Sequence, residues 1–467
     1  MVKTKLIMTL LALLAAGTLP AQEYSWSRYA MDGHRTGGDM ALKGAAAKEV
    51  KLIEKYQPSM AFLKEVVGYS PEEMYSHRPQ SPLSNWLADL MLEESERLTG
   101  EKCDVSLTNF GGIRVDMPKG EVTVDDIRSM LPFKNYVVYL KISGDSLWTV
   151  FDKMAQGRFE VLGGVKIRAG RKCLESVEIG GEPFDRSKVY TLITNSFLLD
   201  GGDGLFLRRS SQECRVLDQD FYEMAVDHLR RCMAEGRQVT GAVDDRIVLT
   251  HINKPRKKEN QSDAGRNIVP VHSPAPAGHR LTILHTNDTH SHLETIRSGR
   301  YAGLGGVVER AAFVDSVRRA DGRRNVLLLD AGDWDQGTSW FSVLKGRPEI
   351  EAMNIMKYDA ATFGNHEWDN GIEDLADRIG KARFKILLCN YKVDDGRLNR
   401  LVKPYAIVRR GGMKIGLIGA LVDVSSVVDR PIADKLGYIR PDGPVNEWAA
   451  FLKEKKKCDL VIVLSHL

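Results

Sequence analysis

The sequence predicts two folded halves of different fold class, an α+β half over residues 24–250 and an α/β half over residues 281–467. The later half alternates short apolar runs with apolar stripes at helical spacing, which is typical of parallel strands connected by helices. The earlier half mixes strands and helices without that alternation. Between the halves, residues 254–280 are polar, contain prolines and glycines, and show no apolar periodicity, which predicts a flexible linker.

The strands of the later half are expected at runs rich in Val, Ile and Leu, because such residues favour buried strands. These runs lie near residues 281–286, 325–330, 359–363, 385–389, 413–420 and 459–465. Helices are expected between them, and their core faces are marked by two stripes, Val307, Val308, Ala311, Ala312 and Val314 in one and Ile372, Leu375, Ala376 and Ile379 in the other.

In the earlier half, helices are expected near residues 83–98 and 146–155, and strands near residues 136–142 and 190–194. A chain of 467 residues with 43% hydrophobic content is sufficient for two substantial cores. Lys and Arg together number 66 against 62 Asp and Glu, a balance that argues against a protein that wraps a nucleic acid polymer. The six cysteines show no CxxC pairing of the metal-binding type, and the oligomeric state is left open.

Acidic, histidine and asparagine residues follow the predicted strands of the later half. They are Asp288 and His290, then Asp333, then Asn365, and finally His466. In open parallel sheets the carboxyl ends of the strands share one edge, so these residues are expected to meet there. Each cluster alone is also ordinary loop chemistry. Together they suit two divalent cations that share one carboxylate, grip a phosphate and activate water.

The later half resembles the calcineurin-like metallophosphoesterases and, within them, the 5'-nucleotidase family. The motifs that carry the resemblance are His285-Thr-Asn-Asp-Thr-His290, Ala331-Gly-Asp333 with Gln336-Gly-Thr338, and Gly364-Asn-His-Glu-Trp-Asp369. The resemblance implies a layered α/β/β/α domain that holds two divalent metal ions, which are Mn, Zn, Co or Mg. It implies that Asp288 and His290 bind one ion, that Asp333 bridges both, and that Asn365 and His466 bind the other.

The same resemblance implies that His366 is catalytic and not a metal ligand. Oriented by Asp369, His366 would stabilise charge on the phosphoryl oxygens and the leaving group while a metal-activated water attacks phosphorus. A cationic imidazole beside a carboxylate suits that task.

Residues 24–250 resemble the nucleotide-binding domain of the 5'-nucleotidase family. The motifs are Asn109-Phe-Gly-Gly-Ile-Arg114, Leu131-Pro-Phe-Lys-Asn135, and Asn195-Ser-Phe197 with Gly201-Gly-Asp-Gly204. The resemblance implies that Phe133 and Phe197 sandwich the base, and that Asn135 and Asp203 bind polar groups of the nucleoside. Taken alone, the two phenylalanines are more typical of a core, and the glycine-rich segment is typical of a tight turn.

Two arginines are implied to hold the phosphate of the nucleotide. Arg114 matches the family by its motif, whereas Arg78, in His-Arg-Pro-Gln-Ser, is a looser match because its surroundings depart from the family pattern. A guanidinium fork suits phosphate oxygens.

The order of the two halves is reversed, since the family places the metal domain first. A fusion of two separately encoded halves, a tandem array without its first metal domain, and an assembly error would each explain the reversal, and a fusion is the most economical.

The family also carries a Gly-His-x-His segment after the strand that corresponds to residues 460–464. This sequence has none, so the metal domain is expected to be incomplete, to continue beyond Leu467 in an intact protein, and to bind at least one metal poorly or not at all as given.

Residues 1–21 are predicted to be a secretory signal peptide, because a basic start precedes a short apolar core that ends near Ala21. The apolar core is shorter than the roughly 20 residues needed to span a bilayer. Together with the family resemblance, this signal implies a bacterial protein that is periplasmic or secreted, without a membrane contact after cleavage of the signal.

Two classes of function follow from the resemblance. The first is an exported hydrolase that releases phosphate from nucleoside 5'-monophosphates, with UDP-sugar hydrolysis and 2',3'-cyclic phosphodiester or 3'-nucleotide hydrolysis as close alternatives. The second is an inactive nucleotide-binding protein whose last metal ligands are missing.

Overall fold

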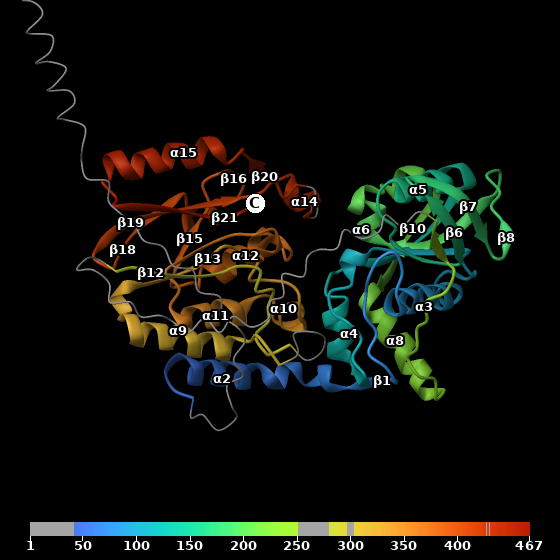
Figure 1. The fold of residues 1–467 in the computed structure, drawn as a ribbon, viewed down its shortest axis with the longest axis horizontal. Coiled ribbons are helices and arrows are strands. Elements are labelled where there is room, and N and C mark those ends of the chain that lie inside the picture. The colour runs from blue at the N-terminus through green and yellow to red at the C-terminus, as the bar shows by residue number, and fades with distance from the viewer. Residues whose placement is uncertain (1–41, 251–279, 297–302, 426, 429) are drawn as a thin grey trace, which may run out of the picture. The chain divides into compact units, whose positions relative to one another are not determined.

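The computed structural model describes residues 42–250, 280–296 and 303–467, apart from residues 426 and 429 (Figure 1). The predicted signal peptide lies outside the described residues, and so does the predicted linker except for its last residue. By their contacts, the described residues of both halves belong to one compact unit. Within the described part of the chain, no helix is long and apolar enough to cross a membrane.

The earlier half is built on a mixed sheet with the order β10-β4-β9-β2-β5. Its strands are β2 (Val105–Thr108), β4 (Tyr136–Ser143), β5 (Val161–Gly163), β9 (Val189–Asn195) and β10 (Ser211–Asp220). Strands β4 and β9 pair antiparallel, whereas β9 and β2 pair parallel. The strands predicted near 136–142 and 190–194 are β4 and β9. Mixed pairing beside separate helices confirms the α+β class.

Two smaller sheets complete the strands of this half. One pairs β1 (Val66–Ser70) with β3 (Gly120–Thr123), and the other has the order β11 (Ile247–Leu249), β6 (Val165–Gly170), β7 (Cys173–Ile179), β8 (Glu182–Pro183). The longer helices are α2 (Gly44–Tyr56), α3 (Pro82–Thr99), α5 (Gly144–Gln156) and α8 (Phe221–Ala234), and the short ones are η1 (Gln57–Lys64), η2 (Phe110–Gly112), α4 (Val124–Met130), α6 (Ser196–Leu199), η3 (Gly202–Gly204) and α7 (Leu207–Ser210).

Helix α3 illustrates why these segments form where they do. Its start is fixed by a capping box between Ser81 and Ser84, and its end by Gly100, whose φ of 86° closes the last turn. The helices predicted near 83–98 and 146–155 are α3 and α5.

The later half contains two principal sheets (Figure 1). The first is fully parallel, with β12 (Thr282–Thr286), β13 (Val326–Asp330), β14 (Ala360–Thr362), β15 (Lys385–Leu387) and β17 (Val402–Lys403) in that order. The second has β18 (Tyr405–Arg410), β19 (Met413–Leu421) and β21 (Leu460–His466), with β19 and β21 parallel. A short ribbon pairs β16 (Tyr391–Val393) with β20 (Leu436–Tyr438).

The helices of the later half are α9 (Val307–Asp321), η4 (Arg323–Asn325), α10 (Ser339–Leu344), α11 (Arg347–Met356), η5 (His366–Trp368), α12 (Ile372–Ile379), α13 (Leu398–Leu401), α14 (Arg430–Ala433), α15 (Asp442–Ala450) and the π-helix η6 (Phe451–Lys455). Both predicted stripes are core faces: α9 buries Val307, Ala311 and Val314, and α12 buries Ile372, Leu375, Ala376 and Ile379.

Side chains of β13 show how the layers are formed. Leu327 and Leu329 are buried with Leu417 of the second sheet, whereas Leu328 points to the opposite face and is buried with residues of α9, α11 and α12. On the outer face of the second sheet, Ile418 packs with Leu452 of η6 and with α15. The predicted α/β/β/α layering is therefore confirmed.

Helix α2 precedes the sheets of the earlier half, yet it packs on α9 and α11 of the later half. Asp315 of α9 accepts a hydrogen bond from the backbone N–H of Ala45 at 2.8 Å and so caps the start of α2. At the other end, Glu351 of α11 accepts a hydrogen bond from the Tyr56 hydroxyl at 2.7 Å and pairs with Lys55. Helix α2 is not among the helices expected from the sequence.

Glu49 lies in the middle of α2 and is fully buried, and among the described residues neither of its carboxyl oxygens has a hydrogen-bond partner. Burial raises its pKa to about 9, although the positive charge of Arg310 acts in the opposite direction. An uncharged carboxyl is therefore the stable form of this side chain in the folded protein at neutral pH.

We expect Glu49→Gln to remove a pH dependence of stability. Between the ordinary glutamate pKa and the folded value of about 9, the folded state keeps a proton that the unfolded state releases, so stability falls as pH rises through that window. The substitution should raise the Tm by several degrees at about pH 8 and by less at about pH 5. Thermal unfolding at both pH values measures this, and an equal shift at the two would contradict the burial of a neutral carboxyl.

Candidate metal and nucleotide site

The predicted metal ligands all lie at the carboxyl ends of strands. Asp288 and His290 follow β12, Asp333 follows β13, Asn365 follows β14, and His466 is the last residue of β21. Because β12, β13 and β14 are parallel neighbours and β21 runs parallel to β19, these ends gather in one region. The structure therefore brings together residues that are far apart in the sequence.

The loops after β12 and β13 are joined to one another by their backbones. The N–H of Asp288 donates to the carbonyl of Gly332 at 2.9 Å, and the N–H of His290 donates to the carbonyl of Asp333 at 3.0 Å. Asp288, His290 and Asp333 adopt left-handed backbone conformations, with φ of 50°, 44° and 57°. Such strained positions in residues other than glycine cluster at functional sites.

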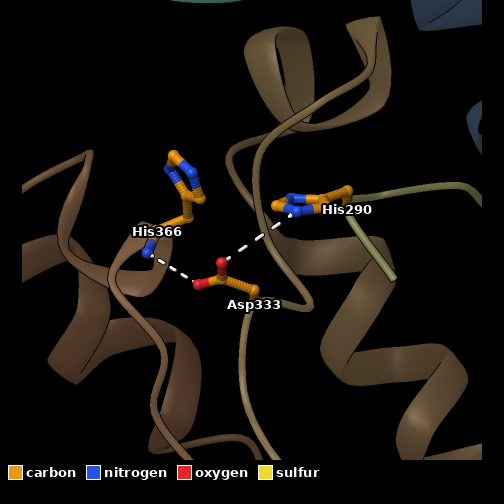
Figure 2. A group of neighbouring side chains, drawn as sticks. All are labelled: His290, Asp333 and His366. Carbon is orange, nitrogen blue, oxygen red and sulfur yellow. Dashed lines mark hydrogen bonds and ion pairs between the residues drawn. The ribbon is translucent and has the colours of Figure 1, made fainter. Parts of the chain in front are cut away.

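The Asp333 carboxylate is the centre of the metal group, by which we mean Asp288, His290, Asp333, His366 and His466. His466 Nε2 lies 3.3 Å and His290 Nε2 lies 4.0 Å from Asp333 Oδ2, while the backbone N–H of His366 donates to Oδ1 at 2.9 Å. Figure 2 shows His290 and His366 on either side of this carboxylate. Asp333 is only 3% exposed, so its charge is little screened by water.

Two sets of side chains are compact enough to hold a metal ion. One contains His290, Asp333 and His366, the other contains Asp288, Asp333 and His466, and in each set the potential ligand atoms lie within 4.8 Å of one another. Asp333 belongs to both, as expected of a shared carboxylate. Asp288 Oδ1 also lies 3.9 Å from His290 Nε2, so the pairing of these two that the resemblance implies remains sterically available.

The donor chemistry fits divalent cations. His290 Nδ1 lies 3.2 Å from the carbonyl oxygen of Gln336, and His466 Nδ1 lies 2.9 Å from that of Ala331. With each Nδ1–H donating to these carbonyls, loss of any proton on Nε2 would leave a lone pair that faces Asp333, an arrangement typical of histidine ligands. Asn365 is half-buried at the start of η5 and offers a further amide oxygen.

Charges in the site are strongly interdependent. Hydrogen bonding to Asp333 raises the pKa of His466 to about 9. Burial acts to raise the pKa of Asp333, but the hydrogen bond from His466 and the charge of His366 outweigh it, and the pKa is lowered. Burial lowers the pKa of His290, which favours the neutral imidazole that binds metals.

His366 has the partner that the resemblance implies. Its Nδ1 lies 2.9 Å from Asp369 Oδ2. Burial acts to lower the pKa of His366, but the bond to Asp369 more than compensates and the pKa is raised. The imidazole ring centroids of His366 and His290 are 5.3 Å apart, so His366 also lies within reach of a metal ion.

Gln336 is a residue of the candidate site to which sequence reasoning assigned no role. Its side-chain N–H donates to Asp369 Oδ2 at 3.0 Å, and its backbone carbonyl faces His290. It therefore contacts both the candidate ligand His290 and Asp369, the partner of the predicted catalytic histidine. The signal was its place in the Gln336-Gly-Thr338 motif.

Two of the predicted nucleotide-binding residues lie beside the metal group. The rings of Phe133 and His366 have centroids 5.8 Å apart, and the Arg114 guanidinium lies 5.8 Å from the Phe133 ring. Phe133 is only half-buried, so it is not an ordinary core residue. Asn135, two residues later, accepts a hydrogen bond from the Ser196 hydroxyl at 3.3 Å.

Arg78 and Arg114 line one cavity of about 370 Å³, together with His77 and Phe110. Arg78 is held by an ion pair with the buried Glu160 at 2.8 Å and lies 4.6 Å from the Phe110 ring. A cavity with two guanidinium groups suits a phosphate, and the looser sequence match of Arg78 still leads to a position beside Arg114.

Phe197 and Asp203 lie on the loop after β9. Phe197 is 38% exposed, and Asp203 has a φ of 49° in the turn that follows. The sequence is also compatible with a tight turn in this glycine-rich segment, and the structure contains a turn there. Within the described residues, neither side chain makes a hydrogen bond or ring contact with the metal group.

Comparison with known proteins separates the same two halves. Residues 281–467 match the family model of calcineurin-like phosphoesterases, and residues 65–209 match that of the 5'-nucleotidase C-terminal domain. The domain described as C-terminal in its family thus precedes the phosphoesterase domain here, in agreement with the reversed order.

Curated relatives match over part of their length. Snake venom 5'-nucleotidase of Naja atra is 43% identical over 160 residues, which cover 32% of this chain and 30% of the relative. Protein UshA of Escherichia coli (strain K12) is 31% identical over 194 residues, which cover 40% of this chain and 34% of the relative. The chain therefore spans about a third of these relatives. The structure is similar to a 5'-nucleotidase precursor from Thermus thermophilus, with a TM-score of 0.39, 27% identity, and coverage of 45% of this chain and 43% of that chain.

We expect His366→Ala to separate a catalytic role from a ligand role. If His366 stabilises developing charge, turnover of a phosphate ester should fall by about 10²-fold or more while bound metal per chain stays unchanged. His290→Ala is the matched control, because loss of a ligand should lower the metal content itself. Elemental analysis after dialysis, together with steady-state kinetics, distinguishes them. Loss of metal from His366→Ala as well would reassign His366 as a ligand.

Proposed function

Because the chain joins a calcineurin-like phosphoesterase domain to a domain of the 5'-nucleotidase C-terminal family, we propose that it is an exported, metal-dependent hydrolase that releases phosphate from nucleoside 5'-monophosphates. The observation that carries the proposal is the contact between halves: Phe133, from a nucleotide-binding motif, lies against His366 of the metal group with ring centroids 5.8 Å apart. This contact supports the proposal that nucleotide recognition and phosphate chemistry take place in one compact unit.

The roles of the residues follow from their positions. Arg78 and Arg114 would hold the phosphate in the cavity that they line. Phe133 and Phe197 would stack on the base, an interaction worth roughly 1–3 kcal/mol per base. Asn135 and Asp203 would bind polar groups of the nucleoside.

The metal group would supply the remaining chemistry. Asp288, His290, Asp333, Asn365 and His466 would hold two divalent cations, whose identity is open. When bound, such cations polarise phosphoryl oxygens and activate water. His366, oriented by its 2.9 Å contact with Asp369, would place positive charge beside the phosphoryl oxygens and the leaving group.

Export is proposed from the predicted signal peptide at residues 1–21. A periplasmic or secreted location would follow, with nucleotides as partners rather than nucleic acid polymers. No membrane contact is proposed after cleavage.

Three other activities use the same kinds of residue: UDP-sugar hydrolysis, 2',3'-cyclic phosphodiester hydrolysis and 3'-nucleotide hydrolysis. A nucleotide-binding protein without hydrolysis is the alternative from a different class. We expect faster phosphate release from 5'-AMP than from 3'-AMP in the presence of Mn²⁺. The reverse order would favour the 3'-nucleotidase, and binding of adenosine without hydrolysis of any nucleotide or UDP-sugar would favour the binding protein.

We expect Phe197→Ala to raise the KM for 5'-AMP about tenfold, because one stacking surface for the base is lost. Hydrolysis of a small aryl phosphate should hardly change, since that substrate has no base to stack. Phe206→Ala is the matched control: Phe206 is also exposed, at 44%, and belongs to the same loop region. Equal losses on both substrates, or equal effects of both variants, would contradict base stacking by Phe197.

A further inference from the structure

Glu367 carries a carboxyl group that lies between the loops after β13 and β14, which we call the metal loops. The proposed hydrolysis gives this side chain no role. Its side chain is fully buried. It accepts backbone hydrogen bonds from Asp333 at 3.1 Å, from Asp335 at 3.2 Å and from Gly364 at 2.5 Å. Two of these donors belong to the loop after β13 and one to the loop after β14, so a single carboxylate joins the two loops.

The two loops approach each other closely at this point. A Cβ on Gly364 would lie 2.1 Å from Asp333 Oδ1, and a Cβ on Gly332 would lie 2.4 Å from the backbone nitrogen of Gly364. At such proximity the backbone N–H groups of both loops converge in the interior. A buried N–H without an acceptor is unfavourable, so the converging donors require an acceptor that reaches both loops.

Arg378 of α12 holds the opposite side of the same junction. It is 2% exposed, donates to the backbone carbonyl of Glu367 at 3.0 Å, and forms ion pairs with Asp335 and Asp374. Trp368 closes the turn after β14, because its indole N–H donates to the carbonyl of Gly364 at 3.1 Å. Glu367 is thus fixed through its own backbone while its side chain crosses to the neighbouring loop.

We propose that Glu367 is a positioning residue that sets the spacing between Asp333 and the Asn365–His366 turn. It acts through backbone N–H groups and contacts neither substrate nor metal. The carboxylate has acceptor oxygens for both loops at once, and its removal would let Asp333 and His366 move independently. The two ligand sets that share Asp333 would then no longer keep a common geometry. This inference rests on the proposed metal site, but its test does not require hydrolysis.

The test compares Glu367→Gln with Asp359→Asn. Asp359 also accepts a backbone hydrogen bond, from Leu328 at 3.0 Å, and pairs with Arg410, but it lies just before β14, at the strand end remote from the metal loops. Both substitutions replace a carboxyl group by an amide and keep a side chain of similar size. In Glu367→Gln, the new amide N–H groups oppose the backbone donors that the carboxylate accepts.

Amide hydrogen exchange of the full chain is the first measurement. We expect Glu367→Gln to accelerate exchange at Asp333, Asp335 and Gly364 by about tenfold or more, whereas Asp359→Asn should accelerate only amides near Leu328. We also expect Glu367→Gln to weaken Mn²⁺ binding by about 10–100-fold in a calorimetric titration, with little change for Asp359→Asn. A folded Glu367→Gln protein with unchanged exchange at these amides would overturn the proposal, and so would an equal loss of Mn²⁺ affinity in both variants.

The unsubstituted protein provides a check that does not depend on the folding of a variant. If Glu367 holds both loops, the amides of Asp333, Asp335 and Gly364 should be protected to a similar degree. Exchange of any one of them at the rate of an exposed amide would contradict the role. If the exchange results are as expected and no nucleotide is hydrolysed, the proposed function fails and the positioning role stands.

Discussion

The contacts of the Asp333 carboxylate are the interactions on which the rest of the later half depends. It is almost completely buried, it belongs to both candidate ligand sets, and it contacts histidines from β21 and from the loop after β12. A buried negative charge is unfavourable unless cations or hydrogen bonds compensate it. Parallel strands bring the compensating groups close to Asp333, because the carboxyl ends of the strands meet at one edge of the sheet. Asp333 itself lies at that edge with a left-handed backbone conformation.

The surroundings of Asp333 contain more buried acids than buried bases. Asp335, Glu349 and Glu367 are all nearly inaccessible to water, and Arg378 is the buried cation that pairs with Asp335. Desolvation raises the pKa of Glu349 to about 8 and that of Glu367 well above its ordinary value. Such a concentration of buried carboxyls makes the charged forms electrostatically costly when the loops assemble.

The sequence predicts the layers and the candidate ligands because these depend on local patterns. Each principal strand of the metal half except β17 and β18 carries an apolar run that is recognisable in the sequence, and each ligand follows or ends such a strand. The strand β18, Tyr405–Arg410, is not among the expected strands, since two of its residues are arginines and its burial is partial. The grouping of His366 with His290 and Asp333 also has no local signal, because it arises from the packing of separate loops. The contact of α2 with α9 joins residues 270 positions apart, and a local apolar pattern does not identify which distant helix it will contact.

Helix α2 has a consequence for how the gene can be arranged. Its cap comes from Asp315 and its final turn binds Glu351. The contact between the halves therefore depends on complementary surfaces and not on the order in which the halves are translated. A covalent connection then contributes only a high local concentration of one half around the other. The contacts that join the halves therefore involve the same side chains whichever half comes first in the chain.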